Sequence, residues 1–260
     1  MNIVVCIKQV PNTNEVKIDP KTGTLIREGV PSIINPDDKA GLEAALRLKD
    51  SQGAHVTALS MGPPQAETAL REALAMGADE AVLVTDRAFG GADTWATAHT
   101  IAAALKKLPY DLILTGRQAI DGDTAQVGPQ IAENLDIPNI SYAEEIKVEG
   151  EYVTVKRQFE DRYHILKAKM PCLITALSEL NTPRYMTPGG IFDAYRKEIK
   201  KITRADLDVA DGDIGLKGSP TRVVKTFTKS PKAAGTLVTN LNSQEAADYI
   251  LEKLKEKFII

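Results

Sequence analysis

Several features that mark common classes of protein are scarce in this sequence of 260 residues. It has two cysteines, Cys6 and Cys172, and each lies inside an apolar run. We therefore interpret them as small buried side chains rather than as a disulfide or a metal-binding pair. The three histidines, His55, His99 and His164, do not have the spacing of metal ligands. The sequence therefore predicts no metal site.

Net charge and long apolar runs are scarce as well. The formal net charge is −3 at pH 7, which gives no overall basic field to attract nucleic acid or anionic lipid. No apolar run reaches the roughly 18 residues that a membrane-spanning helix needs. Residues 3–7 form a strand-like run where a secretory signal would have a basic segment and a longer apolar one. We therefore expect a cytoplasmic protein with no nucleic-acid or membrane partner.

Motifs for common catalytic chemistry are missing too. No Ser or Cys lies in a nucleophile-elbow context, and neither the Walker pattern nor G-x-G-x-x-G occurs. These absences argue against a kinase or an ordinary dehydrogenase. The sequence predicts no catalytic side chain of its own.

Strands and helices alternate through the first half of the sequence. Buried-type apolar runs predict strands at residues 2–8, 54–60, 81–85, 110–115 and, later in the chain, 171–177. Helical spacing and start signals predict helices at residues 35–48, 63–77, 93–107 and 123–135. This alternation predicts an α/β fold with a doubly wound, mostly parallel sheet of the adenine-nucleotide-binding type.

The second half of the sequence has a different pattern. Residues 146–155 and the pair Ile165-Leu166 suggest an antiparallel extension of the sheet, with a turn at Glu149-Gly150. Beyond residue 180 the alternation is lost, and helices are predicted only at residues 191–200 and 243–258. A long stretch without its own core usually lies on a partner. We therefore predict a nucleotide-binding domain over residues 1–180 and a partner-binding arm with a C-terminal helix over residues 181–260.

The loop at residues 116–128 follows a predicted strand and runs into a predicted helix. In an open parallel sheet, ligands bind beyond the carboxyl ends of the strands, and backbone amides at a helix N-terminus suit phosphate. We expect these amides and Thr124 to hold phosphate, while Asp121 and Asp123 cap the helix or meet hydroxyl groups. An ordinary capped turn is the alternative interpretation.

A second loop, at residues 89–94, also connects a predicted strand with a predicted helix. Its Gly90-Gly91 pair, followed by Asp93 and Thr94 at the helix start, can form a cradle for phosphate. A flexible surface loop is the alternative. Two such loops after strands of one sheet favour a shared nucleotide site.

The same segments resemble the β subunit of the electron-transferring flavoproteins. The resemblance spans nearly the whole chain in the family's order, at residues 1–10, 35–36, 61–63, 75–79, 116–128 and 181–185. It implies a heterodimer with an FAD-carrying α subunit. In the ordinary branch of the family the β subunit holds AMP. In the electron-bifurcating branch it holds a second FAD that oxidises NADH, sending one electron to ferredoxin and the other through the α-subunit FAD to an acyl-CoA dehydrogenase-like reductase.

The resemblance also implies site residues. Carried over by position, the nucleotide site would consist of Cys6, Asn35, Pro36, Asp37, Asp38, Met61, Gly116, Arg117, Gln118, Ala119, Ile120, Asp121, Gly122, Asp123, Thr124, Ala125, Gln126 and Val127. The second loop would add Phe89, Gly90, Gly91, Ala92, Asp93 and Thr94. Cys6 would contribute its backbone, and Asn35 has a helix cap as its alternative role.

The second loop also indicates a branch of the family. Residues 88–94 resemble the bifurcating kind, because a glycine pair gives a pyrophosphate and a flavin more backbone room than AMP needs. We therefore expect FAD, with NADH as electron donor, in an NADH-dependent bifurcating acyl-CoA reductase complex. The alternatives are a non-bifurcating β subunit that holds AMP and, from another class, a nucleotide-binding sensor or adenine-nucleotide hydrolase.

The segment after Pro183-Arg184-Tyr185 resembles the loop by which the β subunit contacts its dehydrogenase partner. Its apolar candidates for that contact are Met186, Pro188, Ile191 and Phe192. Residues 187–190 depart from the mammalian-type pattern, which leaves the identity of the partner open.

Overall fold

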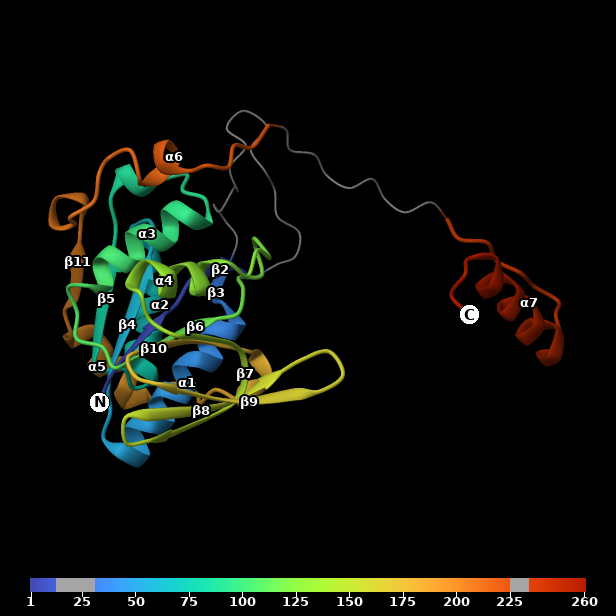
Figure 1. Cartoon of the computed structure of the whole chain (residues 1–260), viewed down its shortest axis with the longest axis horizontal. Helices are drawn as coiled ribbons and strands as arrows, with labels where there is room; N and C mark the ends of the chain where they lie inside the picture. Colours follow the sequence, from blue (N-terminus) through green and yellow to red (C-terminus); the bar gives the residue numbers. More distant parts are fainter. Residues whose placement is uncertain (13–30, 225–233) are drawn as a thin grey trace. The chain divides into compact units, whose positions relative to one another are not determined.

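The apolar runs of the first half form buried parallel strands, as their uninterrupted hydrophobicity predicts. The computed structural model describes residues 1–12, 31–224 and 234–260. The chain divides into two units, Met1–Val224 and Lys225–Ile260 (Figure 1). The first unit contains the sheet and the candidate site.

Within the described residues, nine strands form one sheet in the order β11-β5-β4-β1-β6-β10-β7-β8-β9. Neighbouring strands are parallel from β11 to β7, whereas β7, β8 and β9 are antiparallel. The strand bounds are β1 Asn2–Cys6, β4 His55–Met61, β5 Glu80–Val84, β6 Leu112–Gly116, β7 Asn139–Glu149, β8 Tyr152–Gln158, β9 Tyr163–Lys169, β10 Cys172–Ala176 and β11 Ile199–Ile202. A separate antiparallel pair consists of β2 Gln9–Pro11 and β3 Ser32–Ile34.

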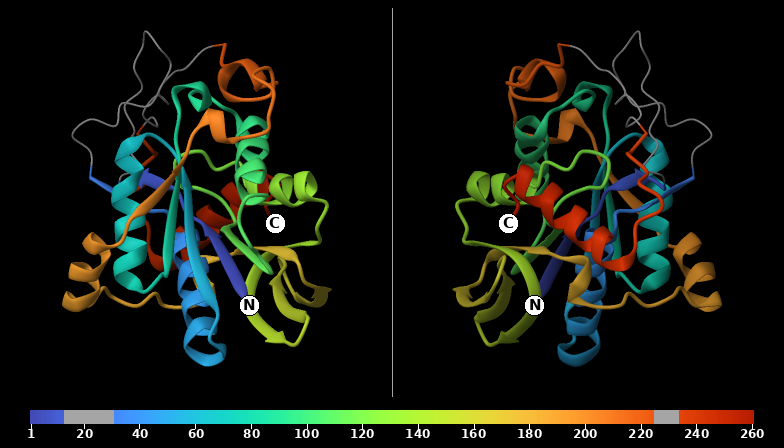
Figure 2. Two further views of the ribbon diagram at one scale, coloured as in Figure 1. Left: turned by 90° about the vertical axis from the view of Figure 1, so that its left-hand side faces the viewer. Right: turned by 90° about the vertical axis from the view of Figure 1, so that its right-hand side faces the viewer.

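Helices cover both faces of the sheet (Figure 2). On β1, Ile3 and Val5 belong to the hydrophobic cluster on the α1 and α2 face, and Val4 belongs to the cluster on the α3 and α4 face. The helix bounds are α1 Pro36–Gln52, α2 Glu67–Met76, α3 Thr94–Leu105, α4 Val127–Leu135, α5 Pro188–Arg196, α6 Gly215–Gly218 and α7 Ser243–Glu256. Short 3₁₀ helices lie at η1 Pro64–Ala66, η2 Arg87–Phe89, η3 Ser178–Leu180 and η4 Arg204–Asp206. The predicted doubly wound α/β class with an antiparallel extension is confirmed.

The connections create a switch point next to β1. The chain runs from β1 through α1 to β4 and through α2 to β5, and α3 then brings it back to β6 on the other side of β1. Successive connections therefore diverge at the carboxyl ends of β1 and β6. This is the place where open α/β sheets bind ligands.

Two local predictions are wrong. The helix predicted at 123–135 begins at Val127, because Asp123 and Ala125 have φ angles of 50° and 53°, which a right-handed helix does not allow. The helix predicted at 191–200 spans Pro188–Arg196, with Thr187 as its cap. It is followed by β11, whose Ile-Lys-Lys-Ile sequence is too short for a periodic signal.

Residues beyond 180 contribute to the first unit. Ile199 and Ile202 of β11 are buried in hydrophobic clusters on opposite faces of the sheet. The guanidinium of Arg71 on α2 donates to the carbonyl oxygens of Ala194 and Lys197, each at 2.6 Å. The first unit therefore runs past the predicted domain boundary to Val224. The partner-binding role expected of residues 181–260 stays a prediction.

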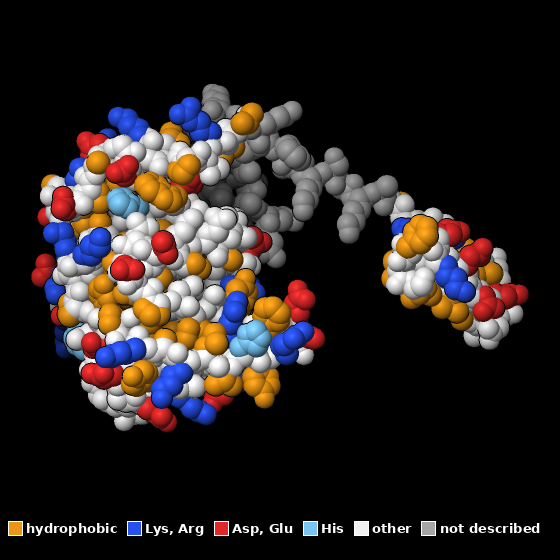
Figure 3. All heavy atoms as spheres, in the orientation of Figure 1, with side chains coloured by type: hydrophobic (Ala, Val, Ile, Leu, Met, Phe, Trp, Pro, Cys, Tyr) orange, Lys and Arg blue, Asp and Glu red, His pale blue; other side chains and the backbone are white. Residues whose placement is uncertain are grey.

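The second unit contains α7, close to the helix predicted at 243–258. A capping box starts it, because Asn242 accepts from the amide of Glu245 and the Glu245 carboxylate accepts from the amide of Asn242. Ile250, Leu251 and Phe258 are exposed within this unit. In the part of the chain that the structure describes, no helix is long and apolar enough to cross a membrane. On the face of the first unit in view in Figure 3, side chains of both charge signs are interspersed.

Candidate nucleotide site

The carboxyl ends of β1 and β6 are held together by one buried carboxylate. Asp38, in the first turn of α1, accepts from the Lys8 amide through Oδ2 at 2.8 Å and from the Gly116 amide through Oδ1 at 2.9 Å. Burial raises the pKa of the Asp38 carboxyl to about 7. Through its two hydrogen bonds, the Asp38 side chain fixes the direction in which the backbone continues beyond β1 and β6.

Asn35 holds the next part of the loop that follows β6. Its side chain is fully buried, and its Nδ2 donates to the Gln118 carbonyl oxygen at 2.8 Å. Its Oδ1 accepts from the Ile120 amide at 3.1 Å. Asn35 stands at the N-cap position of α1, but its side chain makes no cap hydrogen bond to that helix. The alternative role of Asn35 as a side-chain cap is therefore wrong.

Asp37 links the same loop to the end of β10. Its Oδ1 accepts from the Ser178 amide at 3.1 Å, and its Oδ2 lies 3.5 Å from Nε of Arg117. Burial raises the pKa of the Asp37 carboxyl, although the nearby Arg117 guanidinium opposes this shift. The amide of Arg117 donates to the Ala176 carbonyl oxygen at 2.8 Å. Residues 37 and 38 thus connect three strand ends.

Gly116 fits closely against these acids. A Cβ at this position would overlap Oδ1 of Asp38 and would lie 2.8 Å from Cβ of Asp37. A side chain here would push the loop away from α1. The close approach of the backbone at Gly116 is therefore to the first turn of α1.

The acids of the loop have partners other than α4. Asp121 forms an ion pair with Lys8, with Nζ 2.6 Å from Oδ1, and the side chain of Asp121 is nearly buried. Asp123 accepts from Nε2 of Gln118 at 2.9 Å. These acids do not cap α4, because the loop bends before the helix begins. The alternative, that they meet hydroxyl groups, stays a prediction. Their pairing removes part of the negative charge that would repel a phosphate.

Five consecutive amides at the end of the loop have no acceptor within the described residues. They belong to residues 124–128, the last two of which lie in the first turn of α4. Thr124 is exposed beside them. Unpaired amides at the start of a helix form a site for an anion. This arrangement suits the phosphate contact predicted for Thr124 and its neighbours.

The second loop lies beside the first. The hydroxyl of Thr94 donates to Oε1 of Gln126 at 2.8 Å, which joins the two predicted binding loops directly. Asp93 caps α3 by accepting from the Ala96 amide at 3.0 Å. Phe89 is buried in the core, Gly90 and Gly91 are exposed, and Ala92 is half-buried.

Residues 214–221 pack against this second loop. No pattern in the sequence predicts this contact. Gly91 has φ +73°, and a Cβ there would lie 3.2 Å from Cβ of Leu216. The Leu216 amide donates to the Gly90 carbonyl oxygen at 3.0 Å, and Ser219 accepts from the Asp93 amide at 2.8 Å. A side chain at Gly91 is therefore disfavoured by the positive φ angle and by the contact with Leu216, whether or not a ligand binds.

The other predicted residues lie around the switch point. Burial raises the pKa of the Cys6 thiol to about 12, so this cysteine is unreactive at neutral pH. Met61 ends β4, the strand that pairs with β1. Pro36 is exposed in the first turn of α1, and Ala119 is half-buried in the loop. The structure thus brings the predicted residues to the ends of β1, β4, β5 and β6.

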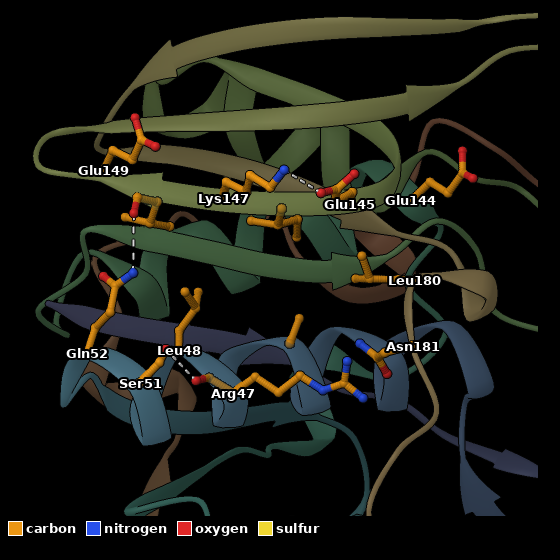
Figure 4. A pocket seen from close by; sticks show the side chains of 13 residues that line it. Arg47, Leu48, Ser51, Gln52, Glu144, Glu145, Lys147, Glu149, Leu180 and Asn181 are labelled. Carbon is orange, nitrogen blue, oxygen red and sulfur yellow. Dashed lines mark hydrogen bonds and ion pairs between the residues drawn. The ribbon is translucent and has the colours of Figure 1, made fainter.

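Two surface hollows lie away from these residues. One, of about 430 Å³, lies between the C-terminal half of α1 and β7 and is lined by polar side chains such as Arg47, Gln52 and Glu145 (Figure 4). The other, of about 540 Å³, lies between α2 and α5 and is lined partly by Met186 and Ile191. Neither hollow includes a predicted nucleotide-site residue.

The fold is that of an open, doubly wound α/β protein, and the loop at its switch point carries five consecutive amides without an acceptor among the described residues. The family model described as "Electron transfer flavoprotein domain" matches residues 22–207. The chain is 61% identical, over the full length of both chains, to the electron transfer flavoprotein subunit beta of Clostridium acetobutylicum. It is 56% identical to the caffeyl-CoA reductase-Etf complex subunit CarD of Acetobacterium woodii, again over all of both chains.

A further relative is the acryloyl-CoA reductase electron transfer subunit gamma of Anaerotignum propionicum, at 48% identity over all of both chains. The chain therefore belongs to the electron transfer flavoprotein family, and along its whole length it corresponds to the β subunits of that family.

Proposed function

We propose that this β subunit holds FAD in the crevice at the ends of β1 and β6 and takes part in electron bifurcation. The supporting observation is the set of amides at residues 124–128, free of described acceptors and joined to the glycine-pair loop through the Thr94–Gln126 hydrogen bond. In this proposal NADH is the electron donor. One electron goes to ferredoxin, and the other passes through the α-subunit FAD to an acyl-CoA dehydrogenase-like reductase.

The residues of the crevice would bind and orient the cofactor. The amides of residues 124–128 and the Thr124 hydroxyl would donate to phosphate oxygens. The Lys8–Asp121 ion pair would keep a negative charge next to the phosphates compensated. When bound, FAD would supply the hydride-accepting and one-electron chemistry, and the protein would supply position and electrostatics.

The second loop favours the larger cofactor. Gly90 and Gly91 are exposed beside Thr94, and their bare backbone leaves room for a diphosphate and a flavin. Gly90 is the more informative of the two glycines, because its φ of −64° accepts a side chain, although a Cβ there would lie 3.2 Å from the Arg87 carbonyl oxygen. Two relatives point in the same direction, since their names place them with a caffeyl-CoA reductase and an acryloyl-CoA reductase.

A surface around α5 suits the reductase partner. Tyr185, Phe192 and Tyr195 are 95%, 71% and 74% exposed, next to the hollow between α2 and α5. Exposed aromatic side chains beside a hollow are typical of protein interfaces. Nε of Arg184 lies 2.8 Å from Oε2 of the buried Glu43, which fixes the backbone next to Tyr185. We propose this surface as the docking site of the acyl-CoA dehydrogenase-like protein.

The cofactor content of the purified αβ heterodimer tests the proposal. Two FAD per heterodimer support it, and one FAD with one AMP would show the non-bifurcating alternative to be correct. A stable monomer that binds or hydrolyses ATP would instead support the sensor or hydrolase class.

The glycine loop can be tested separately. We expect Gly90→Val to lower FAD occupancy of the β subunit and NADH oxidation, because the branched side chain fills space beside the proposed phosphates. Gly212→Val is the control, since a Cβ at Gly212 meets no atom within 4 Å. Unchanged FAD content in Gly90→Val would contradict the assignment of this loop.

A further inference from the structure

Two side chains at the start of α1 make four hydrogen bonds to the backbone that leaves β1 and β6. Asp38 accepts from the amides of Lys8 and Gly116. Asn35 donates to the carbonyl of Gln118 and accepts from the amide of Ile120. Their distances lie between 2.8 and 3.1 Å. We call this set of contacts the α1 clamp.

Neither clamp side chain is accessible to a bound molecule through the atoms that it uses. Asn35 is 0% exposed and Asp38 is 7% exposed, and the polar atoms of both side chains are bonded to the backbone that follows β1 and β6. In the resemblance these residues belong to the nucleotide site, but the geometry gives them a different task. They contact the backbone that carries the site.

The loop beyond the clamp is bent in a way that needs support. Asp123 and Ala125 both have positive φ angles, which are unfavourable for a residue other than glycine. Such conformations persist only where the surroundings hold them. The clamp holds the loop on one side of this bend and α4 holds it on the other.

We propose that Asn35 and Asp38 are positioning residues, which keep the loop after β6 in the shape that leaves the amides of residues 124–128 free for a phosphate. This inference rests on the proposed nucleotide site and assigns these two residues a role within it. Losing the clamp would let the loop relax, and its amides would turn to other acceptors or to water. Affinity for any ligand bound through phosphate would then fall, whether that ligand is FAD or AMP.

The test uses the αβ heterodimer with Asn35→Ala, Asp38→Ala and Asp38→Asn, after the β-site nucleotide has been removed. Asn181→Ala is the matched control, because Nδ2 of Asn181 donates to the Ala40 carbonyl on the same helix at 2.9 Å but does not touch the loop. The measurements are the dissociation constants of FAD and of AMP at the β site and amide hydrogen exchange of the ligand-free protein. FAD retained by the α subunit serves as the internal reference for an intact heterodimer.

We expect Asn35→Ala and Asp38→Ala to weaken both ligands about tenfold or more, which is the size of effect for a lost buried hydrogen bond. Asp38→Asn keeps one acceptor oxygen and should recover part of the affinity. The double variant Asn35→Ala with Asp38→Ala should lose less than the product of the single effects, because both side chains act through one loop. Hydrogen exchange should be faster in the clamp variants at the hydrogen-bonded amides of residues 116–123 and unchanged there in Asn181→Ala.

The proposal is overturned if the two alanine variants bind FAD and AMP as tightly as the unmodified protein, or if Asn181→Ala weakens them equally. It is also overturned if hydrogen exchange of the loop does not change. An unmodified protein that binds AMP but not FAD contradicts the bifurcating function, and the clamp is then judged by the AMP affinities. An unmodified protein that binds neither ligand overturns both.

Discussion

The two ends of α1 carry polar side chains that differ in burial and in their contacts. At its start, Asn35, Asp37 and Asp38 are buried and bonded to the backbone of other segments. Over its last turns, Arg47 and Gln52 are exposed and line the hollow between α1 and β7 (Figure 4). Buried polar groups are costly unless they are paired. The buried set therefore fixes the positions of the segments that it contacts, whereas substitutions in the exposed set should change stability little. The following substitutions test this difference.

The largest effect is expected at the buried end. Gly116→Val places a branched side chain against Asp37 and Asp38 and should lower the free energy of unfolding by about 3 kcal/mol, as overpacking of a closed site does. Urea denaturation measures the change. Gly122→Ala is the control in the same loop, because a Cβ there meets nothing within 4 Å. Equal losses in the two variants would show that the loop does not fit closely against α1.

Glu43, in the middle of α1, is expected to give an intermediate effect. Its buried carboxylate accepts from Arg184 and Arg47, and these contacts hold its pKa below the usual value although burial opposes them. Glu43→Gln should lower the free energy of unfolding by about 2 kcal/mol, since a charged partner of Arg184 is lost. The same denaturation experiment with Asp50→Asn, the exposed partner of Arg184, is the control. A smaller loss for Glu43→Gln than for Asp50→Asn would contradict the comparison.

The pH dependence of stability should reveal Asp38. Its pKa in the folded protein, about 7, lies above the ordinary value of 3.8, so the folded state binds more protons than the unfolded state between these values. The contribution of Asp38 is therefore most favourable at low pH and is lost as the pH rises toward 7, by at most about 1.4 kcal/mol per pH unit. The charge of Asp37 adds to this rise in the pKa of Asp38, and Asp38 in turn raises the pKa of the Cys6 thiol.

Denaturation of the unmodified protein and of Asp38→Asn between pH 5 and pH 8 measures this contribution. The difference between the two slopes isolates Asp38, because a group such as Glu43, whose pKa lies below the ordinary value of 4.5, stays ionised over this range in both proteins. Identical slopes would show that Asp38 does not titrate in this range.

The smallest effect is expected at the hollow between α1 and β7. Lys147 pairs with Glu145 at 2.7 Å, but both side chains are at least half exposed. Lys147→Ala should change the free energy of unfolding by less than about 0.5 kcal/mol. A loss of unfolding free energy comparable to that of Glu43→Gln would mean that the side chains lining this hollow are more rigid than their exposure indicates.

Local sequence patterns predicted much of the sheet and the place of the site. Continuous apolar runs predicted the parallel strands, and the strand-end rule placed the loops at residues 89–94 and 116–128 at one crevice. These signals are local, because burial of a strand shows in its own composition. The start of a helix at Asp93 was also predicted locally, and the structure shows Asp93 as the N-cap of α3.

Other features could not be predicted from local patterns. The four residues of β11 carry no periodicity that separates a strand from a loop, and the packing of residues 214–221 on the glycine pair had no signal in the sequence. The partner of Asp121 is Lys8, 113 positions away. A charge at a strand end does not reveal which distant charge it will meet.

The sequence by itself therefore determined most of the buried parallel strands and the helices between them, since continuous apolar runs and helical spacing show which segments can be buried. It also determined the family, through motifs spread along the whole chain. Only the tertiary structure decided what Asn35 and Asp38 do. Their partners lie 83 and 78 positions away in the loop after β6, and α1 meets that loop only because β6 pairs with β1 in the sheet.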